Sequence, residues 1–272
     1  MPLPNGYMTS DEMIAAIDAQ LDAIIADHTD KLERAIEACR LRIINMLMTE
    51  DFEDIDMKRL QTLHQNAVKT INEVYGTAVQ SLDYSEIANL VSDSLKASNV
   101  DVAFTVADKQ MMDALKGNLA DVYVKLGASV GTQIGQAIYS SILGGVGADE
   151  LAAQVTNALI GLSDRAGRPM TQYVGMYTQD GVMEFYSAIH RKKAKDVGIK
   201  KFLYAGTVIK TTRPFCRARV GNVYTEEQIQ SWQNMQWKGK KEGNIWLTRG
   251  GYRCRHHFRP VVDPVELEEI PF

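Results

Sequence analysis

The stretch MIAAIDAQLDAIIADHTDKLERAIEACRLRIINM, residues 13–46, decides the fold class of this chain. Apolar residues recur in it at steps of three and four, which is the spacing of one face of an α-helix. Proline and glycine are missing from residues 7–75. The pattern therefore predicts one helix over residues 10–48, roughly 55 Å long. The stripe consists of Ile14, Ile17, Leu21, Ile24, Leu32, Ile36, Cys39, Ile43 and Met46.

A second apolar stripe follows a short acidic break at residues 51–56. Carboxylates favour a helix N-terminus, so the break fits a turn that leads into a new helix. The second stripe predicts a helix over residues 57–82 and hence an antiparallel hairpin within residues 1–100. Such stripes form cores far more often than cofactor sites, and this one is also open to helices of other copies of the chain.

The composition is that of an ordered protein. The 272 residues are 45% apolar and 24% charged, which suffices for a large core. No run of eighteen apolar residues predicts a membrane span, and the start, MPLPNGYMTSDE, lacks the pattern of a secretory signal. Three cysteines fit a reducing compartment better than a disulfide framework. We therefore expect a protein that is made in a cytoplasm and either stays there or leaves inside something else.

The net charge of −4 conceals a strong asymmetry. Residues 190–259 hold seventeen Lys and Arg against four Asp and Glu, a local balance of +13, and the rest of the chain balances at −17. The asymmetry indicates either a surface for nucleic acid or another acidic partner, or acidic and basic parts that complement each other. Both interpretations stay open, because charge runs report association and not fold.

Residues 101–197 have the pattern of a helical region rich in small residues. A helix predicted over residues 108–143 carries one glycine per turn, a spacing that lets another backbone pack closely. These glycines are Gly127, Gly131 and Gly135. Before this helix, residues 100–106 fit a short strand, a helical turn or a loop about equally well.

Two more helices are predicted in the same region. One begins near Ala148, after a glycine-rich turn that lacks the GK[ST] signature of a phosphate loop. The other begins at Pro169 and ends near residue 196, in the basic cluster at residues 191–195. Lys and Arg in a last turn offset the helix dipole, and we favour this interpretation of the cluster over a nucleic-acid contact.

After Gly198, β-branched and aromatic residues punctuated by Gly and Pro replace the helical pattern. They predict a strand, a loop that carries Arg213 and Cys216, and a second strand near residues 220–224. A capping box then starts a short helix at Thr225, and the pattern of IWLTR fits a further strand. The predicted fold class is mainly α, of the α+β kind. It comprises a long N-terminal hairpin (1–100), a helical middle region (101–197) and a small mixed C-terminal domain (198–272).

Several short segments between residues 198 and 261 occur in a distinctive order: GIKKFLYAGT, TRPFC, GNVY, a tryptophan, and GGYRCRH. This order resembles the phage Mu protein F-like family of minor head, or head morphogenesis, proteins. In that family a helical region precedes a small domain with an Arg-x-x-Cys stretch and a terminal stretch like Gly-Gly-Tyr-Asn-Cys-Arg-His. The similarity covers a quarter of the chain and leaves residues 1–100 uncovered. Many members carry an acid shortly before the Thr-Arg pair, where this chain has VIK at residues 208–210.

The resemblance implies a structural, low-copy virion protein of a tailed bacteriophage. Such a protein contacts portal or capsid proteins, and packaged DNA without sequence preference, in the capsid interior or at the portal vertex. It acts in head assembly or in genome packaging and delivery, after assembly in the host cytoplasm and without a membrane. The alternative is a prophage-derived or host nucleic-acid-binding protein with a zinc-stabilised basic C-terminal domain.

The arginines of the C-terminal domain are candidate phosphate ligands. They could also pair with acids of a neighbour, or hold loops by donating to backbone carbonyls. Alternation along a strand would place Arg253, Arg255 and His257 together on one exposed face. The full set is Arg213, Arg217, Arg219, Arg249, Arg253, Arg255 and Arg259. Of these, we predict phosphate contacts for Arg217, Arg219, Arg253 and Arg255.

Cys216 and Cys254 are expected to lie close in space, with His256 nearby. Zinc would find only three of its four ligands there, because His257 would point to the opposite strand face. A disulfide is disfavoured in a reducing cytoplasm, and the third interpretation is two small buried thiols that pack under the loops. We favour the third, because no CxxC pair completes a metal signature. The prediction is a structural clamp of Arg213, Cys216, Cys254 and His256, with no metal or other cofactor and no catalytic residue.

Overall fold

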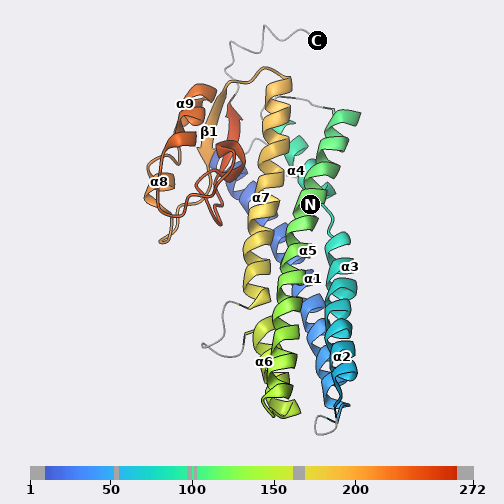
Figure 1. Ribbon diagram of the computed structural model, residues 1–272. Coiled ribbons are helices and arrows are strands. Elements are labelled where there is room, and N and C mark those ends of the chain that lie inside the picture. Colours follow the sequence, from blue (N-terminus) through green and yellow to red (C-terminus); the bar gives the residue numbers. More distant parts are fainter. Residues whose placement is uncertain (1–9, 52–54, 97–99, 101–102, 162–168, 262–272) are drawn as a thin grey trace. The chain divides into compact units, whose positions relative to one another are not determined.

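The computed structural model describes residues 10–51, 55–96, 100, 103–161 and 169–261. The chain is mainly helical with a small three-stranded antiparallel sheet near the C-terminus, which confirms the predicted fold class (Figure 1). Among the described helices, none combines the length and apolarity needed to cross a membrane. The chain divides into two compact units. Unit 1 comprises residues 1–25, 83–116 and 179–272, and unit 2 comprises residues 26–82 and 117–178.

Helix α1, Ser10–Met48, has the bounds that its apolar stripe predicts. The buried positions along it follow the helical repeat, as expected. The ends of the stripe differ from the prediction, because Met13 and Leu47 are buried, whereas Ile14 and Met46 are only half-buried. The 3.6-residue helical period does not match a fixed pattern of three- and four-residue steps. Over many turns the buried face therefore drifts along the sequence, and at the ends of the helix it falls one residue away from the predicted stripe. The predicted cap residue Thr9 lies outside the described residues.

The second arm of the hairpin is continuous and helical. It runs through α2 (Met57–Thr70), a π-helical turn η1 (Ile71–Tyr75) and α3 (Gly76–Gln80). Asp56 caps α2 by accepting a hydrogen bond from the backbone N–H of Arg59 at 2.7 Å, so the acidic break starts a helix as predicted. A further helix, α4 (Ser85–Lys96), follows, to which the sequence patterns had assigned no element.

Helix α5 (Val106–Leu143) packs its glycines against the second arm within unit 2. A Cβ atom at Gly127 would lie 3.3 Å from the ring of Tyr75, and one at Gly131 would lie 3.5 Å from Val68. At Gly135 it would lie 2.3 Å from Nε2 of His64. The predicted role of these glycines, close approach of two helices, is therefore confirmed.

Replacing Gly127 by Leu is expected to reduce the free energy of unfolding by about 1–3 kcal/mol, because the new side chain meets the buried ring of Tyr75. The matched control is Gly117→Leu in the same helix, where a Cβ meets nothing within 4 Å. That control is expected to stabilise the chain by about 0.5–1 kcal/mol through helix propensity. Urea unfolding of both variants measures the difference, and equal effects at the two positions would contradict the packing argument.

Two further helices complete the helical part. Helix α6 (Ala148–Leu159) belongs to unit 2 and begins where the sequence predicts. Helix α7 (Met170–Asp196) also has its predicted bounds. Its first turns lie in unit 2, where Tyr123 donates a hydrogen bond to Thr178 at 3.0 Å, and its remainder lies in unit 1.

The C-terminal part of unit 1 contains the sheet, in the strand order β2–β1–β3. Strand β1 (Lys201–Ala205) pairs antiparallel with β2 (Val223–Thr225) and with β3 (His257–Val261). Short helical segments fill the connections: α8 (Pro214–Arg217), α9 (Glu226–Ser231), η2 (Trp232–Asn234) and α10 (Ile245–Thr248). The capping box at Thr225 is present in full.

One predicted strand in this part is wrong. The segment IWLTR forms helix α10, not a strand, because Asn244 caps it by accepting a hydrogen bond from the backbone N–H of Trp246. The tryptophan side chain is buried and packs edge-on against Phe202 of β1 at 5.0 Å between ring centroids. A short apolar run fits either state, and here the cap and the packing against the sheet select the helix.

Candidate functional site

Two cysteines and a histidine meet inside the C-terminal part. Cys216 lies on α8, which Pro214 initiates, and Cys254 and His256 lie just before β3. The two Sγ atoms are 4.0 Å apart, and Sγ of Cys254 is 3.5 Å from Nδ1 of His256. All three side chains are at least 95% buried, with exposed fractions of 1%, 2% and 5%. The predicted proximity of the three residues is confirmed, and their ligand atoms all lie within 4.8 Å of one another.

Tyr204 of β1 and Gly250 enclose this cluster. The Tyr204 hydroxyl donates to Sγ of Cys216 at 3.5 Å and lies 3.7 Å from Sγ of Cys254. Its ring stacks on His256 with 5.5 Å between centroids. At Gly250, an added Cβ would lie 2.2 Å from Sγ of Cys216, so only glycine leaves room for the sulfur.

The loop that carries Cys254 is held in an unusual backbone conformation. Arg249 and Arg253 both have positive φ angles, 52° and 55°, which non-glycine residues seldom adopt. The Arg249 side chain is 1% exposed and donates to the carbonyl of Met183 at 2.9 Å and to the Ser187 hydroxyl at 3.1 Å, both on α7. It also reaches the carbonyl of Cys254. Arg249 therefore ties the cysteine loop to α7.

The two thiols are coupled. The hydrogen bond between them raises the pKa of Cys216 and lowers that of Cys254. Cys216 can donate only while it keeps its proton, and its donation stabilises the thiolate form of Cys254. In an accessible site a Cys–His pair could act as nucleophile and base. Here the described residues bury both sulfurs, so a substrate could not reach either of them.

His257 does not lie on an exposed basic face, contrary to the prediction. Its side chain is 0% exposed, packs edge-on against Tyr186 of α7 at 5.5 Å, and has Nδ1 3.6 Å from a carboxylate oxygen of Asp18. Strand β3 begins only at His257, and the positive φ at Arg253 interrupts the assumed alternation before it. Arg253 and Arg255 are exposed, so the prediction holds for them alone.

Most arginines of this part donate to backbone carbonyls. Arg213 donates to the carbonyl of Tyr252, so this member of the predicted clamp bridges the two sequence signatures. Arg217, which is exposed, donates to the carbonyl of Ile209 at 2.9 Å. Arg219 donates to the carbonyl of Phe215 at 2.9 Å and stacks over that ring at 3.9 Å.

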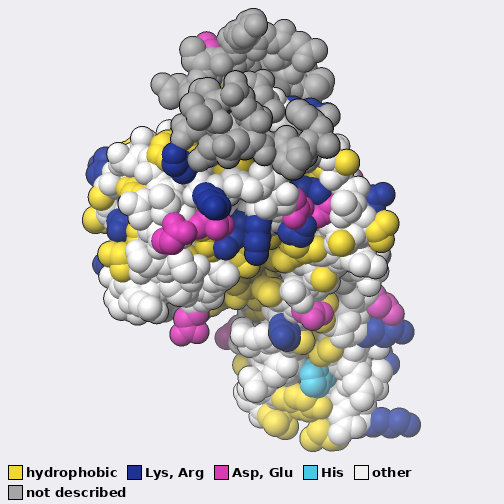
Figure 2. All heavy atoms as spheres, turned by 90° about the horizontal axis from the view of Figure 1, so that it is seen from above, with side chains coloured by type: hydrophobic (Ala, Val, Ile, Leu, Met, Phe, Trp, Pro, Cys, Tyr) yellow, Lys and Arg dark blue, Asp and Glu magenta, His cyan; other side chains and the backbone are white. Residues whose placement is uncertain are grey.

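Two exposed arginines face the rest of unit 1. Arg255 donates to a carboxylate oxygen of Asp22 on α1 at 3.1 Å. The backbone N–H of Arg253 donates to Asp180 at 2.6 Å, and its side chain donates to Gln179 at 3.3 Å. On the face drawn in Figure 2, Lys and Arg side chains are interspersed with Asp and Glu. Part of the basic excess thus meets acidic residues of the same unit, and the side chains of Arg217 and Arg253 are exposed.

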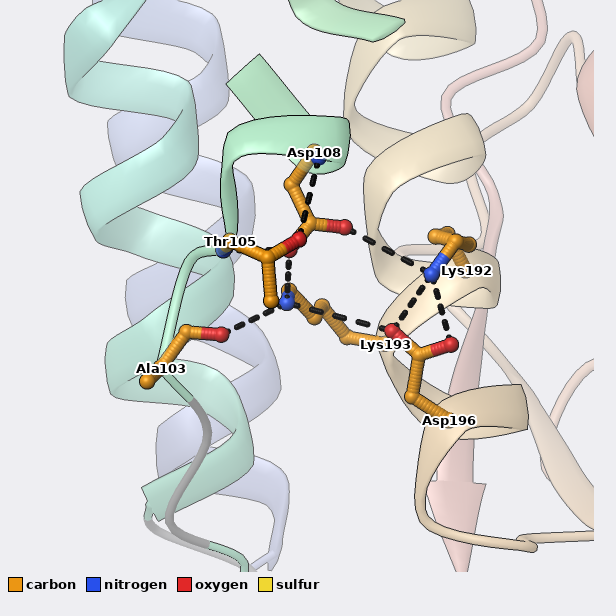
Figure 3. Close-up of polar contacts among 6 residues, drawn as sticks. All are labelled: Ala103, Thr105, Asp108, Lys192, Lys193 and Asp196. Atoms are coloured by element: carbon orange, nitrogen blue, oxygen red, sulfur yellow. Dashed lines mark hydrogen bonds and ion pairs between the residues drawn. The ribbon is translucent and has the colours of Figure 1, made fainter. Parts of the chain in front are cut away.

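The basic cluster at the end of α7 is largely paired inside unit 1 (Figure 3). Lys193 is 2% exposed, makes an ion pair with the fully buried Asp108 of α5 and donates to the carbonyl of Ala103 at 2.7 Å. Lys192 pairs with Asp196 at 2.6 Å and lies 3.6 Å from Asp108.

Asp108 also belongs to a capping box at the start of α5. It accepts hydrogen bonds from the backbone N–H and the hydroxyl of Thr105 at 2.7 and 2.8 Å. Burial alone would raise the pKa of Asp108, but the hydrogen bonds from Lys193 and Thr105 outweigh it and hold the pKa well below its usual range. The dipole interpretation of residues 191–195 therefore omits the ion pairs of Lys192 and Lys193 with Asp108, which connect α7 to α5.

Comparison with known protein families, with curated proteins and with solved structures finds no match for the chain. The site that the geometry does define is the buried Cys216–Cys254–His256 cluster with its enclosing residues Tyr204 and Gly250.

Proposed function

We propose that the chain is a structural minor protein of a tailed-phage particle, which contacts the portal or the inner capsid and acts in head assembly or genome delivery. One observation carries the proposal. The separated segments that resemble the phage Mu protein F-like family meet in one buried cluster, since Tyr204, Cys216 and Gly250 are neighbours there. Segments that share one core are expected to be retained together as a module.

The chemistry of the cluster favours a structural role over catalysis. The sulfurs are almost fully buried, and Arg249 and Arg213 hold the surrounding loops through backbone carbonyls. A nucleophile needs access to its substrate and an aligned base, and burial removes the first of these. The module is thus a rigid platform that presents exposed basic side chains to a partner.

The test of this function is the composition of the particle. In cells that produce the phage encoding this chain, a tagged copy should co-purify with DNA-filled heads at a few copies per head. Deleting the gene should leave heads that package or deliver DNA poorly. Complementation by the wild-type chain should restore infective particles. A chain absent from purified particles, or a deletion without effect on their yield and infectivity, would reject the assignment.

A nucleic-acid-binding protein is the second candidate, favoured by the exposed arginines beside the Cys–His cluster. DNA affinity is expected to fall steeply with salt and to be the same for unrelated sequences, because phosphate neutralisation releases counterions. The double variant Arg217→Ala/Arg253→Ala should weaken binding and lower the slope of log affinity against log salt by about 2.

Titrations of labelled duplexes at several salt concentrations measure this slope. The control is Lys109→Ala, which removes an exposed cation of α5 outside the C-terminal domain and should leave the slope unchanged. Affinity that persists at high salt, or that prefers one sequence, would count against phosphate contact as the mode of binding.

A further inference from the structure

We propose that Cys216, Cys254 and His256 bind one zinc ion, which staples the C-terminal part of the chain. Two thiolate sulfurs and one imidazole nitrogen are preferred zinc ligands, and the three ligand atoms here lie within 4.8 Å of one another. The proposal is independent of the proposed function, since a zinc-stapled module serves a virion protein and a nucleic-acid-binding protein equally.

Two of the three separations between the ligand atoms match a tetrahedral centre. With bonds of about 2.3 Å to sulfur and 2.0–2.1 Å to nitrogen, tetrahedral geometry places two sulfurs roughly 3.8 Å apart and a sulfur and a nitrogen roughly 3.6 Å apart. The observed separations are 4.0 Å between the sulfurs of Cys216 and Cys254 and 3.5 Å between Sγ of Cys254 and Nδ1 of His256. The remaining pair, Sγ of Cys216 and the ring nitrogen of His256, lies within 4.8 Å, so small side-chain rotations are needed to bring all three ligand atoms onto one ion.

The fourth corner of the tetrahedron faces Tyr204. Its hydroxyl oxygen lies 3.5 and 3.7 Å from the two sulfurs, close to the roughly 3.5 Å expected between a sulfur and an oxygen ligand of one zinc ion. The phenol, or a water bound to it, thus completes the coordination. His257 plays no part, because its ring is turned toward Asp18 and Tyr186.

Zinc accounts for features that packed thiols leave unexplained. The surrounding elements are short, with three to six residues each, and the loop at Arg249 and Arg253 is strained. Small loop-rich regions of this kind gain much of their folding free energy from a structural metal.

The experiment is metal analysis of the full-length protein, purified without chelators from zinc-supplemented medium. We expect about one zinc per chain. Cys216→Ser, Cys254→Ser and His256→Asn should each lower the zinc content at least several-fold. Cys39→Ser is the matched control: Cys39 is also a buried free cysteine, but it lies on α1 and contacts the carbonyl of Thr70, so this variant should keep its zinc.

A second measurement keeps the proposal falsifiable if the variants fold poorly. Wild-type protein reconstituted with Co²⁺ should show the strong visible bands of tetrahedral cobalt and thiolate-to-cobalt charge transfer, and Cys39→Ser should show the same spectrum. A weak octahedral spectrum, metal-free protein after reconstitution, or full zinc content in Cys216→Ser would overturn the site. A native mass that is two hydrogens lower, together with failure of Cys216 and Cys254 to react with an alkylating reagent, would show a disulfide and would also overturn the site.

Discussion

Replacing Asp108 by Asn is expected to lower the free energy of unfolding by about 3–5 kcal/mol, because the buried ammonium group of Lys193 then keeps only the partly exposed carboxylate of Asp196, 3.9 Å away, as a counter-charge. The side chains of both partners are at most 3% exposed, so water cannot replace the lost carboxylate. The same change weakens the Thr105 capping box at the start of α5. Urea unfolding followed by circular dichroism measures the loss.

The double variant Asp108→Asn/Lys193→Met separates charge from shape. It removes the unpaired charge while it keeps a long apolar side chain, so it should recover a large part of the stability lost in the single variant. The matched control is Asp196→Asn on the exposed side of the same network, which should cost less than about 1 kcal/mol. A single variant as stable as wild type, or a double variant less stable than the single one, would refute a buried ion pair at this position.

The sequence predicts this network poorly because its partners are far apart. Asp108 and Lys193 are separated by 85 residues, and each alone has an ordinary local explanation, as a helix-start acid and as a helix-end base. Helix bounds, by contrast, follow from local periodicity and caps, which explains why those of α1 and α7, and the start of α6, agree with the structure. Short segments such as IWLTR carry too few residues for periodicity to decide between helix and strand.

The candidate site is predictable in part for the same reason. The two cysteine signatures carry their own sequence patterns, so their proximity could be anticipated. The enclosing roles of Tyr204 and Gly250 and the burial of Arg249 could not, because they depend on how β1, α7 and the loop at residues 249–254 pack. The sequence feature that points most directly to the enclosed cluster is the glycine pair at residues 250–251, since consecutive glycines indicate that the backbone lies close to another group.

His190 should make the folded chain less stable in mild acid. This residue of α7 is fully enclosed, with Nδ1 3.0 Å from the carbonyl oxygen of Phe258, Nε2 3.4 Å from the Ser94 hydroxyl, and its ring against Tyr186 at 5.1 Å. Burial lowers its pKa to about 4, despite the opposing hydrogen bond to Phe258. In the unfolded chain the pKa is about 6.5.

Below about pH 6.5 the unfolded chain therefore takes up a proton that the folded chain refuses, and the folded state loses stability until the pH reaches about 4. The loss attributable to His190 amounts to about 3 kcal/mol over this range, and it is absent at pH 7 and above. The difference in unfolding free energy between wild type and His190→Gln, measured by urea titration from pH 7 to pH 4, should change by this amount in favour of the variant. NMR of the folded protein should show a neutral His190 ring at pH 5.5. A constant difference between the two proteins, or a ring that titrates near pH 6.5 while the protein stays folded, would mean that α7 and β3 leave His190 open to water.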